Sequence, residues 1–146
     1  MKASFEENPF FSIADGAPAD PLTHEVIGAA IEVHRILGPG LLESAYEECL
    51  AYELDLRRLA FSRQVSLPVV YKGVELDCGY RMDLVVESDL IIEIKAVERL
   101  LPIHQAQLLS YLKLSGLSRG LMINFHAKTI GEGIKRLVLD YCPDHE

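Results

Sequence analysis

The sequence predicts one α/β domain, in which a small mixed β-sheet is flanked by helices. A chain of 146 residues has room for a single hydrophobic core. Apolar residues make up 49% and charged residues 25%, a balance typical of globular proteins. The hydrophobic period is helical near the start of the chain and alternates in its middle, which indicates helices followed by strands.

The N-terminal elements are expected to be an irregular arm and two helices. Residues 1–22 combine phenylalanines and prolines without a period, and we expect them to form an arm that precedes a domain of residues 23–146. Thr23 is a favourable N-cap for the first helix, which Gly38-Pro39-Gly40 should end. The second helix is predicted over about 41–58, with a buried side made of Leu42, Ala45, Tyr46, Cys49, Leu50 and Leu54.

Strands are predicted from residue 65 onward. Residues 65–71 alternate, and Pro68 favours an edge position. A turn at Lys72-Gly73 precedes strands at 74–76 and 80–86, which a bulge at Cys78-Gly79 should separate. After a turn at 87–89 come a strand at 90–96, a helix at 102–115 and strands at 121–125 and 134–139. This order predicts a three-stranded meander whose last strand is joined through the helix to a neighbouring strand.

Charge leaves the class of partner open. The chain carries 22 acidic and 14 basic residues, for a net charge of -8. The excess lies at the two ends, because residues 26–139 hold 13 basic and 14 acidic side chains. Electrostatics therefore neither requires nor forbids a polyanionic substrate. The sequence shows no basic patch typical of a DNA-binding module.

Several classes of protein are excluded by what the sequence lacks. No apolar stretch reaches the length of a membrane span, and the N-terminus lacks the order of a secretory signal. Three widely spaced cysteines without a C-x-x-C pair argue against a disulfide framework or a structural zinc site, and they predict a reducing, cytoplasmic location. No serine-hydrolase motif or glycine-rich phosphate loop is present.

The strongest indication of a catalytic site is the pattern formed by Asp83, Glu93 and Lys95. If residues 87–89 are the turn, Asp83 falls opposite Glu93, and Arg81 falls opposite Lys95. Opposed side chains have Cβ atoms about 4.5–5.5 Å apart, so two carboxylates there need a shared proton or a divalent cation. Lys95 lies on the same face, and this combination suits metal-assisted hydrolysis of a phosphodiester.

Four other side chains are candidates for the same site. Glu43 lies on the stripe of its helix that should face the sheet, and it is a candidate third metal ligand. Gln107 and Tyr111 are one helical turn apart and could both face the site. Arg81 could contact a substrate phosphate or pair with a nearby acid. Each has an ordinary alternative: Glu43 as a surface acid, Gln107 as a helix-surface residue, Tyr111 as a core residue.

These residues resemble the motifs of a nuclease superfamily. The segment GLLESAY at residues 40–46 has the pattern G-x-x-E-x-x-Y. The segments RMD at 81–83 and EIK at 93–95 together resemble the D…E-x-K core of the PD-(D/E)XK nucleases. QLLSY at 107–111 is similar to the Q-x-x-x-Y motif of RecB-type nucleases. Together they resemble the GxxExxY protein family, a small bacterial branch of that superfamily. Met82 departs from the proline of the superfamily name, at a position where proline is often replaced.

The resemblance covers about residues 24–139 and implies a restriction-endonuclease-like αβββαβ core. It implies Asp83 and Glu93 as Mg²⁺ ligands, Lys95 as the catalytic lysine, and Glu43 and Gln107 as supporting residues. We therefore expect a nuclease that uses Mg²⁺ or Mn²⁺ and acts on DNA rather than RNA.

Two alternatives stay open: a non-catalytic binding or assembly module, and a hydrolase of another phosphate ester. The arm with Phe5, Phe10 and Phe11 could support a homodimer.

Overall fold

A computed structural model describes residues 11–13 and 20–139 of the chain. The helices are α1 (Pro21–Leu37), α2 (Glu43–Leu56), α3 (Pro102–Ser115) and the short 3₁₀ helix η2 (Ile130–Gly133). The strands, in chain order, are β1 (Phe11–Ile13), β2 (Phe61–Ser66), β3 (Val69–Tyr71), β4 (Val74–Leu76), β5 (Arg81–Val86), β6 (Leu90–Lys95), β7 (Arg119–Asn124) and β8 (Ile134–Leu139).

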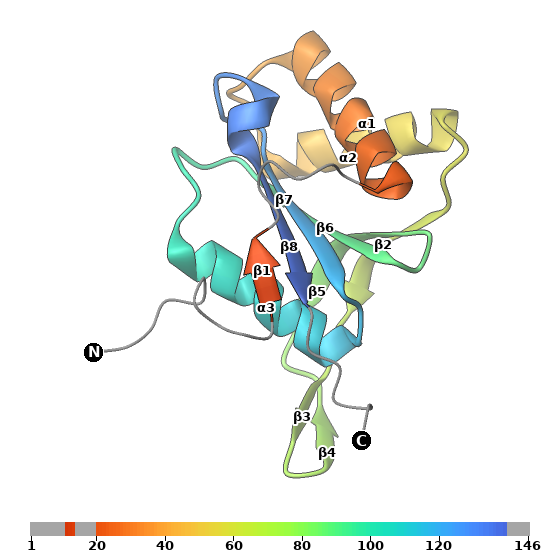
Figure 1. Ribbon diagram of the computed structural model, residues 1–146, viewed down its shortest axis with the longest axis vertical. Helices are drawn as coiled ribbons and strands as arrows, with labels where there is room; N and C mark the ends of the chain where they lie inside the picture. The colour runs from red at the N-terminus through yellow and green to blue at the C-terminus, as the bar shows by residue number, and fades with distance from the viewer. Residues whose placement is uncertain (1–10, 14–19, 140–146) are drawn as a thin grey trace.

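Six strands form one mixed sheet in the order β1-β8-β7-β6-β5-β2 (Figure 1). Strands β2, β5 and β6 pair antiparallel as a meander, and α3 connects β6 to β7, which lies parallel beside it. This arrangement confirms the predicted α/β class, a restriction-endonuclease-like core with a small mixed sheet flanked by helices. The central strand β6 is buried along most of its length, as its unbroken apolar run requires.

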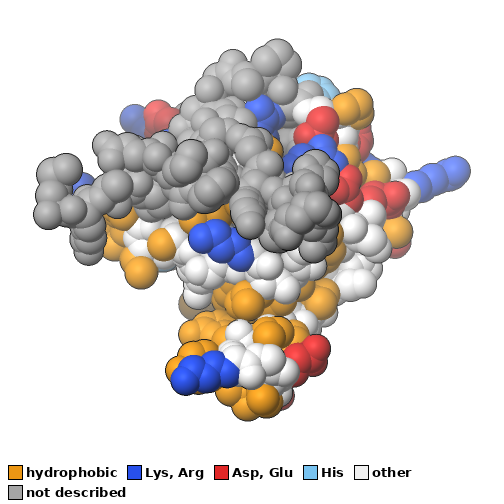
Figure 2. Space-filling view, turned by 60° about the horizontal axis from the view of Figure 1, so that its bottom comes forward, with side chains coloured by type: hydrophobic (Ala, Val, Ile, Leu, Met, Phe, Trp, Pro, Cys, Tyr) orange, Lys and Arg blue, Asp and Glu red, His pale blue; other side chains and the backbone are white. Residues whose placement is uncertain are grey.

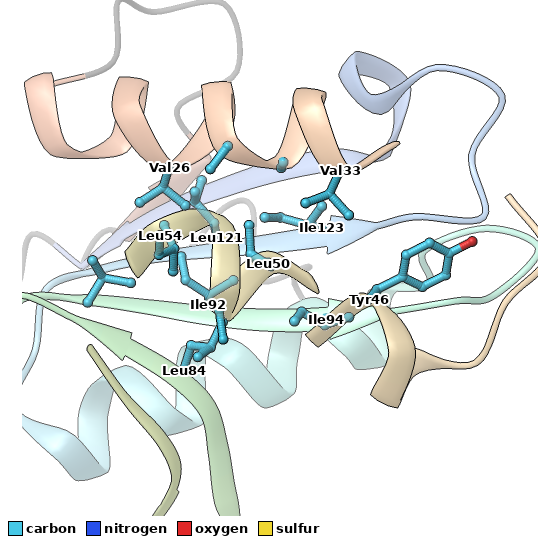
Figure 3. Close-up of a cluster of buried hydrophobic side chains, with 14 of the residues drawn as sticks. Val26, Val33, Tyr46, Leu50, Leu54, Leu84, Ile92, Ile94, Leu121 and Ile123 are labelled. Carbon is cyan, nitrogen blue, oxygen red and sulfur yellow. The ribbon is translucent and has the colours of Figure 1, made fainter. Parts of the chain in front are cut away.

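The helices cover both faces of the sheet. On one face α1 and α2 pack on side chains that include Leu84, Ile92, Ile94 and Leu121 (Figure 3). On the other face α3 packs with Ile91, Met122 and Leu137. Alternate residues of β6 therefore serve opposite cores, and Glu93, which follows Ile91 by two, is directed to the α3 side.

The predicted strand over 65–71 is divided in two, so that prediction is wrong. Strand β2 ends at Ser66 in the large sheet, and β3 pairs only with β4 in a hairpin that projects from the body (Figure 1). Between them Leu67 is buried, and Pro68 has no N–H with which to continue a ladder. The turn at Lys72-Gly73 is as predicted, with both residues at positive φ.

Other local expectations also need correction. The N-terminal arm is not wholly irregular, because Phe11–Ile13 pairs antiparallel with β8. Phe5 and Phe10 lie outside the described residues.

Asp20, not Thr23, caps α1: its carboxylate accepts the Thr23 backbone N–H, and Pro21 occupies the first turn, where a missing N–H costs nothing. Leu42, expected to be buried, is 76% exposed because α2 begins only at Glu43.

No helix in the described part of the chain is both long enough and apolar enough to cross a membrane. Of the three cysteines, Cys49 and Cys78 are free thiols, and Cys142 lies outside the described residues.

Candidate active site

The candidate site lies where strands β5 and β6 separate. Their ladder has the predicted register, with Val86 opposite Leu90, and ends at Leu84 and Ile92. The expected pairing of Arg81 with Lys95 is therefore absent from the described ladder. Beyond its end, side chains replace backbone partners: Glu93 accepts the Asp83 N–H at 3.0 Å, and Asp83 accepts the Ile94 N–H at 2.8 Å.

These reciprocal bonds hold the two carboxylates beside each other in a poorly solvated place. Burial, followed by the nearby Asp83 charge, raises the pKa of Glu93 to about 8. Burial is also the main reason why the pKa of Asp83 is raised, and the charge of Glu47 adds to it. The protein thus keeps two acids together at a cost in free energy that a proton or a cation can offset, as the sequence predicted.

One polar cavity of about 450 Å³ is lined by β5 and β6, the start of α2 and one side of α3. All seven residues proposed from the sequence line it: Glu43, Arg81, Asp83, Glu93, Lys95, Gln107 and Tyr111. The Lys95 ammonium donates to Gln107 Oε1 at 3.4 Å, so β6 and α3 meet across the site. Arg81 is exposed at the start of β5, within reach of a ligand in the cavity. Tyr111 is nearly buried, and burial, reinforced by Glu93, raises its pKa to about 12, so it stays a neutral phenol.

The segment from Gly40 to Tyr46 explains how Glu43 reaches this cavity from a helix. The Tyr46 hydroxyl donates to the Gly38 carbonyl at 2.6 Å and accepts the Leu41 N–H at 3.1 Å, while its ring stacks on Phe125. These contacts fix the loop before α2. Glu43, in the first turn, then accepts the Ala96 N–H at 3.1 Å, just after β6 ends.

A protein-family model for the PD-(D/E)XK nuclease superfamily matches residues 20–137. The chain belongs to that superfamily. Comparisons with curated proteins and with solved structures give no significant match. The matched range runs from the cap of α1 into β8 and includes both carboxylates and Lys95.

The residues present fit the divalent cation that PD-(D/E)XK nucleases usually use. Asp83 and Glu93 offer hard oxygen ligands side by side. Burial, and after it the charge of neighbouring acids, raises the pKa of both carboxyl groups, so a bound cation would favour their ionised forms. Over residues 11–13 and 20–139, no three His, Cys, Asp or Glu side chains form a ready-made metal site. Mg²⁺ retains several waters when bound, so two carboxylates suffice. Glu43 as a third ligand stays a prediction.

Two residues at this PD-(D/E)XK site were missed by sequence reasoning. Gln64 donates to Glu47 at 2.8 Å and to Asp83 at 3.4 Å, so it joins α2 to the first carboxylate. Gln64 lies on β2 with φ of 50°, an uncommon conformation for a non-glycine residue, which points to a demand of the site. Glu47 is buried and also pairs with Arg63. Only its helical spacing of four from Glu43 could have indicated it.

Asn124 is a third residue that the sequence did not single out. It is buried at the end of β7, next to Lys95 in the parallel register. Its side chain accepts the Val97 N–H at 3.0 Å and donates to the Val97 carbonyl at 2.8 Å. It therefore holds the chain that leaves β6 directly after Lys95.

Proposed function

We propose that this protein is a metal-dependent nuclease that hydrolyses phosphodiester bonds, with DNA as its substrate and Mg²⁺ as its metal. One observation carries the proposal: Asp83 and Glu93 bridge the open end of the β5–β6 ladder, with Lys95 and Gln107 facing the same polar cavity. Membership in the superfamily supports the same chemistry.

Asp83 and Glu93 would hold the cation in this proposal. When bound there, Mg²⁺ lowers the pKa of a coordinated water and offsets charge on the phosphate. Lys95 places a positive charge beside the carboxylates, where it can orient the attacking water and stabilise the negative charge of the transition state. Gln107, 3.4 Å from the Lys95 ammonium, would orient that lysine.

The outer residues have supporting roles. Arg81, exposed at the mouth of the cavity, would contact a phosphate of the substrate. Tyr111 would form the floor between the carboxylates and α3. Glu43 would fix the end of β6 through Ala96 and would serve as the third metal ligand.

Finer assignments belong to the same proposal. The G-x-x-E-x-x-Y segment supports placement in the GxxExxY branch, because both its glutamate and its tyrosine make contacts that shape the site. Mn²⁺ would substitute for Mg²⁺ because both prefer oxygen ligands. We also keep a cytoplasmic location and a homodimer as proposals.

A non-catalytic binding or assembly module is the second candidate. It is favoured by one observation: the chain has a net charge of -8, which is unusual for a protein that must grip a polyanion. Such a module would bind its partner with an affinity indifferent to Mg²⁺.

Calorimetric titration separates the two candidates. Mg²⁺ and Mn²⁺ are titrated into the wild type and into an Asp83→Ala/Glu93→Ala variant, with and without DNA. The nuclease proposal expects metal binding by the wild type alone, and DNA cleavage that Asp83→Ala abolishes while the fold remains intact. Cleavage that persists in Asp83→Ala would contradict the assignment, and absence of metal binding with DNA present would favour the module.

A further inference from the structure

A second cavity adjoins the proposed catalytic cavity and has a different character. Its volume is about 470 Å³, within the range of small-molecule sites. Three residues line both cavities: Tyr80, Gln107 and Tyr111. Whatever occupies the catalytic cavity therefore lies next to the second one.

The walls of the second cavity are mainly apolar and aromatic. One wall is a single stripe along α3, at helical spacing, made of Ile103, Ala106, Gln107, Ser110, Tyr111 and Leu114. The opposite wall is the base of the β3–β4 hairpin, where Val69 and Tyr80 enter and leave it. Ile103 is 68% exposed and Tyr80 is 44% exposed, so the apolar surface is open to a ligand.

Tyr80 is positioned to act as a stacking surface. Its ring and that of the buried Tyr111 form a T-shaped pair with centroids 6.1 Å apart, so Tyr111 steadies a ring that is itself 44% exposed. Its backbone carbonyl accepts the Leu67 N–H at 3.0 Å, which ties the base of the hairpin to the end of β2. A fixed, half-exposed aromatic ring beside a phosphodiester site is what a flat heterocycle requires.

The charge of the protein favours an unpaired strand over a duplex at this place. Residues 20–139 carry 13 basic and 16 acidic side chains, so neutralisation of many phosphates cannot supply the affinity. Stacking of bases on aromatic rings needs no basic track. The projecting hairpin is also covered largely by hydrophobic side chains, among them Val70, Tyr71, Val74 and Leu76 (Figure 2). Bases within a duplex are stacked and paired, so they cannot enter the cavity without being extruded.

We propose that the cavity between α3 and the base of the hairpin binds an unpaired nucleobase adjacent to the scissile phosphate, stacked on Tyr80. The inference rests on the proposed nuclease function and extends it: the substrate is single-stranded nucleic acid, or a duplex with an unpaired segment.

The test measures binding of labelled DNA by fluorescence anisotropy, in buffer with a chelator so that no cleavage occurs. The probes are a single-stranded 12-mer, the blunt duplex of the same sequence, and a 12-mer with abasic sites in its centre. We expect the single strand to bind about 5- to 100-fold more tightly than the duplex or the abasic strand, which is the range that stacking of one base on an aromatic ring provides.

Tyr80→Ala is the diagnostic variant, and the exposed Tyr52 on α2, which lines neither cavity, provides the matched control as Tyr52→Ala. Tyr80→Ala should weaken single-strand binding by about 5- to 100-fold and remove the preference for intact over abasic strands. Ile103→Ala should weaken it less, and Tyr52→Ala not at all. Equal binding of duplex and single strand, an unchanged abasic preference in Tyr80→Ala, or a loss caused by Tyr71→Ala instead would overturn the inference.

A parallel cleavage assay with Mg²⁺ keeps this inference separate from the function it rests on. Cleavage of duplex and single strand at equal rates, unaffected by Tyr80→Ala, would refute the base site and leave the nuclease intact. Base-dependent binding through Tyr80 without cleavage by the wild type would support the base site and refute the nuclease.

Discussion

Replacing Glu93 with glutamine should stabilise the metal-free protein, although Glu93 is a proposed catalytic ligand. The folded protein raises the pKa of Glu93 from 4.5 to about 8, through burial and then through Asp83. Between these two pH values the folded state holds a proton that the unfolded state has released. The free energy of unfolding therefore falls as the pH rises through this window, and the effect is complete above pH 8.

The magnitude follows from the pKa values. One pKa unit is worth about 1.4 kcal/mol, so at pH 7 the uptake of a proton by Glu93 costs about 3 kcal/mol, while near pH 4.5 it costs almost nothing. Glutamine has the same shape and requires no proton. Its Oε1 can still accept the Asp83 N–H that Glu93 accepts now. Glu93→Gln should therefore gain up to about 3 kcal/mol over the wild type at pH 7.

Urea unfolding of both proteins in a chelating buffer, followed by circular dichroism at several pH values from 4.5 to 8, measures this difference. With an m-value of about 2 kcal/mol/M, the midpoint of Glu93→Gln should lie about 1.5 M higher at pH 7 and coincide with that of the wild type near pH 4.5. The control is Glu75→Gln, at an exposed position on β4, which should show no shift. A variant that is less stable than the wild type at pH 7, or a difference independent of pH, would refute the reasoning.

Three further perturbations test the supporting structure. Asp20→Ala should lower the free energy of unfolding by about 1–2 kcal/mol at pH 7, because it removes the cap of α1 and the ion pair with Arg119. Burial alone would raise the pKa of Asp20, but hydrogen bonds from Thr23 and Arg119 outweigh burial and lower this pKa to about 2. The difference in unfolding free energy between the wild type and Asp20→Ala should therefore shrink as the pH falls from about 4 towards 2, as measured by urea unfolding. Tyr46→Phe should cost about 1–3 kcal/mol by the same assay, since the Gly38 carbonyl and the Leu41 N–H lose their partner, whereas Tyr52→Phe should cost nothing. Gln64→Ala should reduce kcat of DNA cleavage with little change in Tm; a thermal shift of several degrees with unchanged kcat would assign Gln64 a purely structural role.

Much of the site was determined by local sequence. The turn at residues 87–89 sets the register of β5 against β6, and two-residue alternation then places Asp83 near Glu93 and Lys95 on the same side as Glu93. Gln107 and Tyr111 share a face of α3 because they are four residues apart on a helix. Such short-range geometry depends only on the pleat of a strand and the pitch of a helix, so the sequence by itself predicts it.

Contacts distant in the sequence were decided only by the tertiary structure. The ladder ends at Leu84, since the Asp83 and Glu93 side chains take over the backbone amides, and no local pattern announces where pairing stops. The link of Gln64 and Glu47 to the site exists only once β2 and α2 are brought together at its edge. The division of residues 65–71 between two sheets likewise depends on which strand each half meets. Several distant strands and side chains could pair with the same backbone N–H and C=O groups, and the packing of the whole domain decides which of them does.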